Sequence, residues 1–204
     1  MRRFTSIALA FAFVLSMFSV GGGGNVAAEE SFDCGSLEGL QVLHSTLREQ
    51  ADGGYALFES ISEQCRQAYL DAQAIVRVEV ETGGSEDASK GAMLASGCTN
   101  GWVSARYYTL LGFTAYRYVQ SQYFCWNGSY VYSHSVSHWI DNVDPNFQWQ
   151  GGTVQYDYAS SSGFYTQTQG VVANCPFNWC TGTTYPGAWV QSYGSGYWEG
   201  DAWA

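Results

Sequence analysis

The side chains best suited to acid–base or metal chemistry in residues 98–204 are two histidines. His134 and His138 lie four residues apart in a segment where serine alternates with larger residues, which is typical of a β-strand. On a strand they would lie on one face about 13 Å apart, too far to share a metal ion. We predict that both belong to a core-facing surface, with His138 opposite Arg117, and that the chain binds no metal or other cofactor.

Carboxylates suited to glycoside hydrolysis are scarce, although that reaction needs two of them about 5 to 9 Å apart. Residues 98–204 contain one glutamate, Glu199, and only Asp157 among the aspartates is expected within a strand. The segment Asp141–Asn146 carries four oxygen-bearing side chains and could hold calcium, but its spacing is not that of an EF-hand loop. We favour a turn held by side-chain hydrogen bonds and Pro145.

Strands must position any binding residues, because aromatic and β-branched residues alternate with polar ones throughout residues 98–204. Asn127-Gly128 is a preferred pair for a two-residue type I′ hairpin turn. That turn would place residues whose numbers sum to 255 opposite each other, so Tyr116 would face Trp139. Their shared face would point away from Cys125, toward solvent.

This exposed face is the predicted ligand-binding platform. Aromatic rings stack on the apolar faces of sugars, while amides bond sugar hydroxyls. A protein ligand is equally permitted, because antibody combining sites use a similar set of residues. The alternative is that the aromatic residues fill a thin core between two sheets. The candidate residues are Tyr116, Tyr118, Gln120, Gln122 and Trp139.

All six cysteines follow the apolar N-terminal segment, and an even number in an exported chain predicts disulfides. A hairpin turning near Leu111-Gly112 would bring two of them opposite each other, and another pair would close a short loop. The remaining pair follows by elimination, although a straight helical hairpin turning at Gly53 would place Cys34 nearer residue 73. The expected pairs are Cys98 with Cys125, Cys175 with Cys180, and Cys34 with Cys65.

Residues 29–97 are acidic, and their apolar side chains recur at helical spacing on both sides of Gly53-Gly54. This pattern predicts a hairpin of two helices, with Ser36 capping the first. A weak strand or frayed end is expected at Ile75–Val80, followed by a polar linker from Thr82 to Lys90.

The N-terminus has the layout of a signal peptide, because Arg2 and Arg3 precede an apolar run from Ile7 to Val20. That run is shorter than the roughly 20 residues of a membrane-spanning helix, and we expect cleavage after Ala28. The mature chain would keep 6 basic side chains against 18 acidic ones. Nucleic acid and membrane surfaces are therefore not expected as partners after cleavage.

Two segments, Gln122–Gly128 and Asn174–Cys180, lead through Tyr185-Pro186 to Gly194–Tyr197, so the chain carries CWNG, NC-x4-C, YP and GSGY in that order. This order resembles a loosely defined family of small exported proteins of Gram-positive soil bacteria. The resemblance covers roughly residues 100–200. It implies an export-adapted β domain and transfers no catalytic residue.

Together these patterns predict a mainly β fold, an antiparallel β-sandwich of jelly-roll or immunoglobulin-like type with a short helical N-terminal extension. We expect a signal peptide at 1–28, an acidic helical extension and linker at 29–97, and a disulfide-linked β domain at 98–204. The predicted function is a secreted extracellular binding module with polysaccharide as the leading ligand. A glycosidase-like hydrolase and a structural or inhibitory protein are the alternatives.

Overall fold

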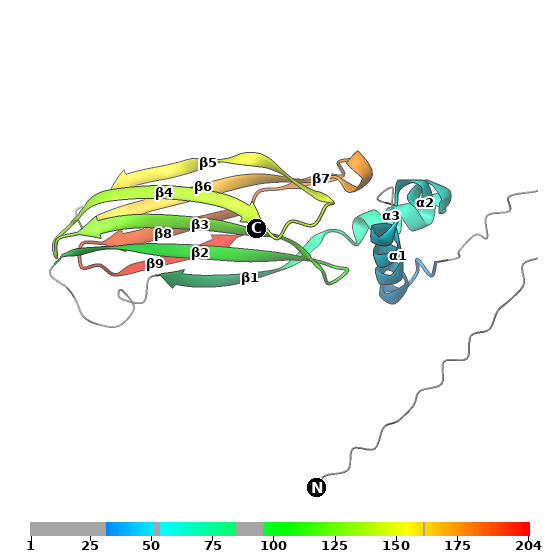
Figure 1. The fold of residues 1–204 in the computed structure, drawn as a ribbon, viewed down its shortest axis with the longest axis horizontal. Coiled ribbons are helices and arrows are strands. Elements are labelled where there is room, and N and C mark those ends of the chain that lie inside the picture. The colour runs from blue at the N-terminus through cyan, green and yellow to red at the C-terminus, as the bar shows by residue number, and fades with distance from the viewer. Residues whose placement is uncertain (1–31, 51–53, 85–95, 161) are drawn as a thin grey trace, which may run out of the picture. The chain divides into compact units, whose positions relative to one another are not determined.

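Two antiparallel sheets packed face to face dominate a computed structural model of the chain, so the predicted mainly β sandwich is confirmed (Figure 1). The predicted signal peptide and most of the predicted linker lie outside the described residues, which are 32–50, 54–84, 96–160 and 162–204. The first sheet contains β1 (Ile75–Gly84), β2 (Gly97–Thr109), β3 (Thr114–Trp126) and β4 (Val131–Asp141). The second contains β5 (Phe147–Ala159), β6 (Gly163–Asn174), β7 (Gly182–Thr184), β8 (Gly187–Tyr193) and β9 (Trp198–Trp203).

Each sheet is built from strands that follow one another along the chain. The orders are β1-β2-β3-β4 and β5-β6-β8-β9, with the short β7 pairing with the end of β6. Jelly-roll and immunoglobulin folds instead use Greek-key connections, so this sandwich differs from both in its strand order. Short hairpins join β2 to β3, β3 to β4, β5 to β6 and β8 to β9.

Within the described residues, three helices precede the sheets: α1 (Leu37–Glu49), α2 (Tyr55–Ser60) and α3 (Glu63–Asp71). The predicted cap is confirmed, because the Ser36 hydroxyl accepts a hydrogen bond from the backbone N–H of Gly39 at 3.1 Å. The second predicted helix is interrupted at Ile61 and begins again after Ser62, which caps α3. Buried Leu43, Leu47, Phe58 and Tyr69 form the centre of this helical cluster.

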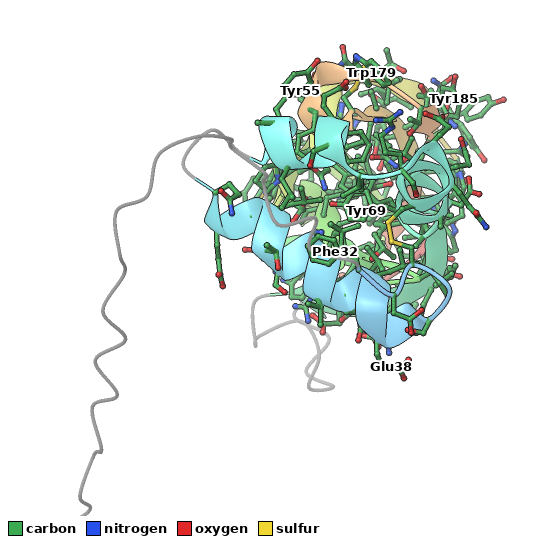
Figure 2. The ribbon with its side chains drawn as sticks, turned by 90° about the vertical axis from the view of Figure 1, so that its right-hand side faces the viewer. Phe32, Glu38, Tyr55, Tyr69, Trp179 and Tyr185 are labelled. Carbon is green, nitrogen blue, oxygen red and sulfur yellow. A yellow bond between two sulfur atoms is a disulfide. The ribbon has the colours of Figure 1, made fainter. Side chains whose placement is uncertain are left out.

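The helices join the sandwich without a linker, and both belong to one compact unit, Ser31–Ala204. Gln41 donates a hydrogen bond to the carbonyl of Leu111 at 2.8 Å, and Arg48 of α1 pairs with Asp144. Figure 2 shows Tyr69 inside this end of the molecule. The predicted boundary at residue 97 therefore separates β1 from the sheet to which it belongs.

The turn between β3 and β4 differs from the predicted one. Asn127 donates its backbone N–H to the carbonyl of Tyr130, which makes Gly128 and Ser129 the central residues of the turn. Gly128 has a φ of +90°, a conformation that glycine adopts readily at the first position of such a turn. The register then shifts between the pair Trp126/Val131 and the next pair along, Cys125/Ser133.

This bulge reverses which residues of β3 and β4 share a face. Beyond it, paired residues have numbers that sum to 258, so Trp139 lies opposite Val119 and not opposite Tyr116. An added residue in one strand of a pair turns every later side chain to the other surface. From Ser133 onward the predicted orientation of β4 is therefore right, and that of Tyr116 to Gln122 on β3 is inverted.

All three predicted disulfides are present. Cys98 and Cys125 are direct partners in the register of β2 and β3, as the predicted hairpin requires. Cys34 reaches Cys65 because the interruption between α2 and α3 redirects the chain, giving a Cα–Cα distance of 5.2 Å. A straight second helix would not have done so.

Candidate functional site

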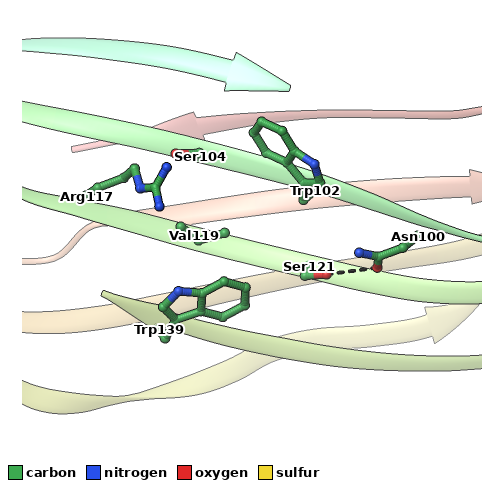
Figure 3. Close-up of a pocket in the computed structure, with 7 residues that line it drawn as sticks. All are labelled: Asn100, Trp102, Ser104, Arg117, Val119, Ser121 and Trp139. Atoms are coloured by element: carbon green, nitrogen blue, oxygen red, sulfur yellow. Dashed lines mark hydrogen bonds between the residues drawn. The ribbon is translucent and has the colours of Figure 1, made fainter. Parts of the chain in front are cut away.

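The outer face of the four-stranded sheet carries a groove of about 210 Å³ between two tryptophans (Figure 3). Trp102 lies on β2 and Trp139 on β4, and β3 runs between them. Strands spaced about 4.8 Å apart place the two backbones roughly 9 to 10 Å from each other. The complete lining is Asn100, Trp102, Ser104, Arg117, Val119, Ser121 and Trp139.

The strand register explains how these side chains converge. One row across the sheet contains Gly83, Trp102 and Ser121, and the adjacent row contains Val119 and Trp139. Small residues on β3 keep the floor low, so the indole rings stand above it. Trp139 is 41% exposed, and Trp102 is partly exposed. The result is a shallow slot with an aromatic ring on each side.

Polar groups stand at the two ends of the groove. Asn100 accepts a hydrogen bond from the Ser121 hydroxyl at 2.8 Å. Arg117 donates two hydrogen bonds to Asp141, at 2.6 and 2.5 Å. This guanidinium holds the pKa of the Asp141 carboxyl below its usual value. Because the two charges neutralise each other, this end of the groove offers hydrogen-bonding groups without a large net charge.

Four of the five predicted binding residues lie in the core, so their predicted exposure is wrong. Tyr116, Tyr118, Gln120 and Gln122 are each 0% exposed, because the bulge after Trp126 turns these positions of β3 toward the second sheet. Burial raises the pKa of Tyr116 and of Tyr118 to about 12. Trp139 is the member of the predicted set that reaches solvent, on the opposite face of the sheet from the other four.

The buried glutamines instead join the two sheets through hydrogen bonds. Gln120 donates to the Thr166 hydroxyl at 2.9 Å and accepts from Thr168 at 2.7 Å. Gln122 accepts from Thr166 at 2.6 Å and donates to Ser192 at 2.9 Å. Every side-chain nitrogen and oxygen of the two glutamines thus has a partner. These residues stabilise the sandwich rather than contact a ligand.

The histidines lie on the inward side of β4, as predicted, in separate environments. His134 stacks on Phe164 with ring centroids 3.9 Å apart and contacts Asp157 at 2.7 Å. His138 pairs in register with Gln120, not with the predicted Arg117. Across the residues with described coordinates, no group of three or more His, Cys, Asp or Glu side chains could hold a metal ion.

The remaining acidic candidates also take part in hydrogen bonds or ion pairs within the chain. Glu199 is exposed and accepts a hydrogen bond from the Tyr193 hydroxyl. In the turn after β4, Asp144 is buried, pairs with Arg48 and accepts the backbone N–H of Asn146 at 3.0 Å. Arg48 and the backbone N–H of Asn146 hold the Asp144 carboxylate. The predicted turn therefore explains the arrangement of this segment, and a calcium ion is not needed to explain it.

No protein-family model, curated protein or solved structure matches this chain. The resemblance to exported proteins of soil bacteria therefore stays a prediction. Of the helices that the structure describes, none is both long and apolar enough to cross a membrane. The three disulfides are compatible with an extracellular protein.

Sequence reasoning missed Trp102 and Asn100, although a usable pattern existed. The predicted pairing of Cys98 with Cys125 already places Trp102 opposite Ser121 and Asn100 opposite Tyr123. Extending that register along β2 would have shown two polar or aromatic residues on the same surface. The bulge beyond Trp126 could not be found in this way, because the residue types of a strand do not reveal where a bulge lies.

Proposed function

We propose that this chain is a secreted carbohydrate-binding module whose ligand lies in the groove between Trp102 and Trp139. The observation that carries this proposal is the placement of two indole rings on either side of a low floor. Aromatic rings stack on the C–H faces of sugar rings, and nearby amides and hydroxyls bond the sugar hydroxyls.

The lining favours a neutral ligand. Asn100 and Ser121 offer uncharged donors and acceptors, and the charge of Arg117 is offset by Asp141. An open, shallow surface of this kind suits a polymer that passes across it. Cell-wall or environmental polysaccharide is therefore the ligand that we favour.

Export is part of the same proposal. The apolar run from Ile7 to Val20 behind two arginines supports a signal peptide, and disulfides persist in oxidising compartments. A module that recognises polysaccharide outside the cell would need both a signal for export and a fold that is stable in an oxidising compartment. N-terminal sequencing of protein recovered from a culture medium tests this step, with Glu29 as the expected first residue.

The binding experiment compares single alanine variants of the two tryptophans on insoluble polysaccharides. Trp102→Ala and Trp139→Ala should each weaken retention about thirtyfold, since an aromatic anchor typically contributes roughly 2 kcal/mol. Their melting temperatures should stay near that of the parent, because both rings lie on the outer surface. Tyr156→Ala, which removes a 58% exposed ring from β5 in the other sheet, is the matched control and should bind normally.

Two results would argue against the proposal. Unchanged retention of both tryptophan variants would show that the groove is not the ligand site. Release of soluble sugar by the intact protein, abolished by Glu199→Gln, would favour a hydrolase over a binding module.

A further inference from the structure

The outer face of the second sheet carries rows of side chains that cross its strands, and this sheet forms one layer of the sandwich (Figure 1). Along β6, Thr166 and Thr168 point into the core, so Tyr165 and Gln167 lie on the outer surface. The register of β5, β6, β8 and β9 extends this surface over four strands. One row contains Tyr158, Tyr165, Gln191 and Glu199, and the next contains Tyr156, Gln167, Trp189 and Asp201.

Aromatic rings from three strands are in contact on this face. Tyr158 of β5 stacks on Tyr165 of β6 with ring centroids 5.2 Å apart, and Tyr165 stacks on Trp189 of β8 at 5.9 Å. Tyr156 and Tyr158 are 58% and 53% exposed. Tyrosine and tryptophan are enriched in protein interfaces, because each brings a large contact area at a small cost in conformational entropy. This strip of rings therefore has the composition of a binding surface.

Both rows end at β9 in a carboxylate. Glu199 and Asp201 are exposed, and within the described part of the chain neither forms an ion pair. Glu199 accepts a hydrogen bond from the Tyr193 hydroxyl, and Asp201 accepts one from the backbone N–H of Ala202 at 2.8 Å. These neutral donors leave both negative charges uncompensated.

The sequence supplies no cation to this sheet, since no lysine or arginine follows Arg117. Charged side chains of the first sheet are instead paired with each other, as in the contact between Arg117 and Asp141. The outer face of the second sheet therefore combines aromatic rings with unpaired negative charge. A cationic partner is complementary to such a face, whereas an anionic partner would be repelled.

The spacing of these groups favours arginine side chains on an extended chain. Asp201 lies directly opposite Trp189 in the register, and a guanidinium can stack on an aromatic ring while it bonds a carboxylate. Glu199 and Asp201 lie two residues apart on one strand, about 7 Å, which is also the distance between alternate residues of an extended peptide. Arginines at alternate positions of such a peptide would therefore reach both carboxylates.

The size of the surface distinguishes a peptide segment from a second copy of this chain. The two rows cover about 14 Å by about 7 Å at ordinary strand spacings. This area accommodates a short extended segment, but it is far below the roughly 800 Å² that each partner buries in a stable dimer. A second copy would also bring like charges together.

We propose that the outer face of the second sheet docks an extended basic segment of a partner protein, with arginines at alternate positions over Trp189 and the two carboxylates of β9. This surface lies on the opposite side of the sandwich from the proposed polysaccharide groove. Its occupation does not depend on a ligand in that groove. The chain would then hold a polysaccharide on one sheet and a basic protein on the other.

The direct test follows the indole N–H NMR signals of the full secreted protein during titration with a synthetic peptide. The peptide has seven residues and blocked ends, with arginine at the third and fifth positions and serine elsewhere. The Trp189 signal should shift saturably at millimolar concentration or below, while the signals of Trp102 and Trp139 stay unchanged. A peptide with two adjacent arginines should bind more weakly, because only one of them faces the sheet. Absence of a saturable Trp189 shift, or equal binding of the two peptides, would overturn the proposal.

Two matched double variants test the role of the carboxylates. Glu199→Gln combined with Asp201→Asn keeps the shapes of the side chains and should weaken peptide binding about tenfold, since each exposed ion pair contributes a few-fold in affinity. Trp189→Ala should weaken binding to a similar extent. Glu49→Gln combined with Glu59→Gln removes the same charge from exposed positions of α1 and α2 and should bind normally. An equal loss in this control would show that the peptide responds only to net charge and would overturn the proposal.

Other occupants of this face give different results. Saturation of the Trp189 signal by glucosamine oligomers but not by the peptide would assign the face to a cationic polysaccharide and overturn the proposal. Sedimentation of the free protein as a dimer that Trp189→Ala dissociates would assign it to a second copy, with the same consequence. Trp139→Ala should bind the peptide as the parent protein does, so the outcome for the polysaccharide groove leaves this test unaffected.

Discussion

Gly83 lies directly opposite Trp102, and the indole ring occupies the space that a side chain at residue 83 would need. A Cβ atom built on Gly83 would approach Cζ2 of Trp102 to 2.3 Å. The absence of a side chain on β1 therefore allows the Trp102 ring to lie over this edge strand. One wall of the groove depends on a residue that contributes no side chain of its own.

Replacing this glycine should disturb binding without removing an aromatic residue. Gly83→Val is expected to push the Trp102 ring away from β1 and to weaken polysaccharide retention about as much as Trp102→Ala, roughly thirtyfold. The retention assay and tryptophan fluorescence would be measured together. Thr82→Val, on the opposite face of the same strand, is the control; normal retention of Gly83→Val would mean that the ring position is unimportant.

The buried glutamines predict a stability effect of a different kind. Gln120→Ala should lower the free energy of unfolding by about 3 kcal/mol or more, because it leaves a cavity and removes one hydrogen-bond partner each from Thr166 and Thr168. Denaturant unfolding would measure the loss. The exposed Gln148→Ala should change stability by less than about 0.5 kcal/mol. Equal effects of the two substitutions would contradict the hydrogen-bond network described for the core.

A pH effect is expected from His44, which stacks on Phe113 with ring centroids 4.1 Å apart. Burial lowers the pKa of His44 in the folded chain, so the unfolded chain takes up a proton first as the pH falls. The stabilisation is complete above about pH 6.5, the usual pKa of histidine, and is lost as the pH falls through the folded pKa.

Melting temperatures measured from pH 8 downward should therefore begin to fall just below about pH 6.5 in the parent protein. His44→Gln should be less stable at pH 8, because it loses the stacked ring, but it should lack this part of the pH dependence. An identical pH profile in the variant would show that another group is responsible.

Local features were predictable where neighbouring residues decide the structure. The Ser36 cap, the helical spacing around Leu43 and Leu47, and the Cys98–Cys125 pairing all follow from short-range patterns. The interruption at Ile61 was not predicted. Ser62, which caps α3, is a local signal for a new helix there, whereas the packing of α2 and α3 around Phe58 is not visible in any local pattern.

The candidate site was predictable only in part, for a geometric reason. Trp139 was placed on the correct face of β4, whereas one bulge beyond Trp126 inverted the predicted orientation of the four candidate residues on β3. The alternation of polar and apolar residues on β3 did not reveal that the predicted orientation of this strand was inverted. Gln120 and Gln122 look like surface residues until the threonines of β6 and Ser192 of β8 are brought against them.

The glutamine–threonine contacts also limit how the two sheets can slide over each other. Apolar side chains would tolerate a displacement along the strands, since one methyl group packs much like another. A displacement of two residues would instead separate Gln120 and Gln122 from Thr166, Thr168 and Ser192, leaving several buried polar atoms unpaired. The buried hydrogen bonds therefore fix a single offset of one sheet relative to the other, which apolar packing alone would leave undetermined.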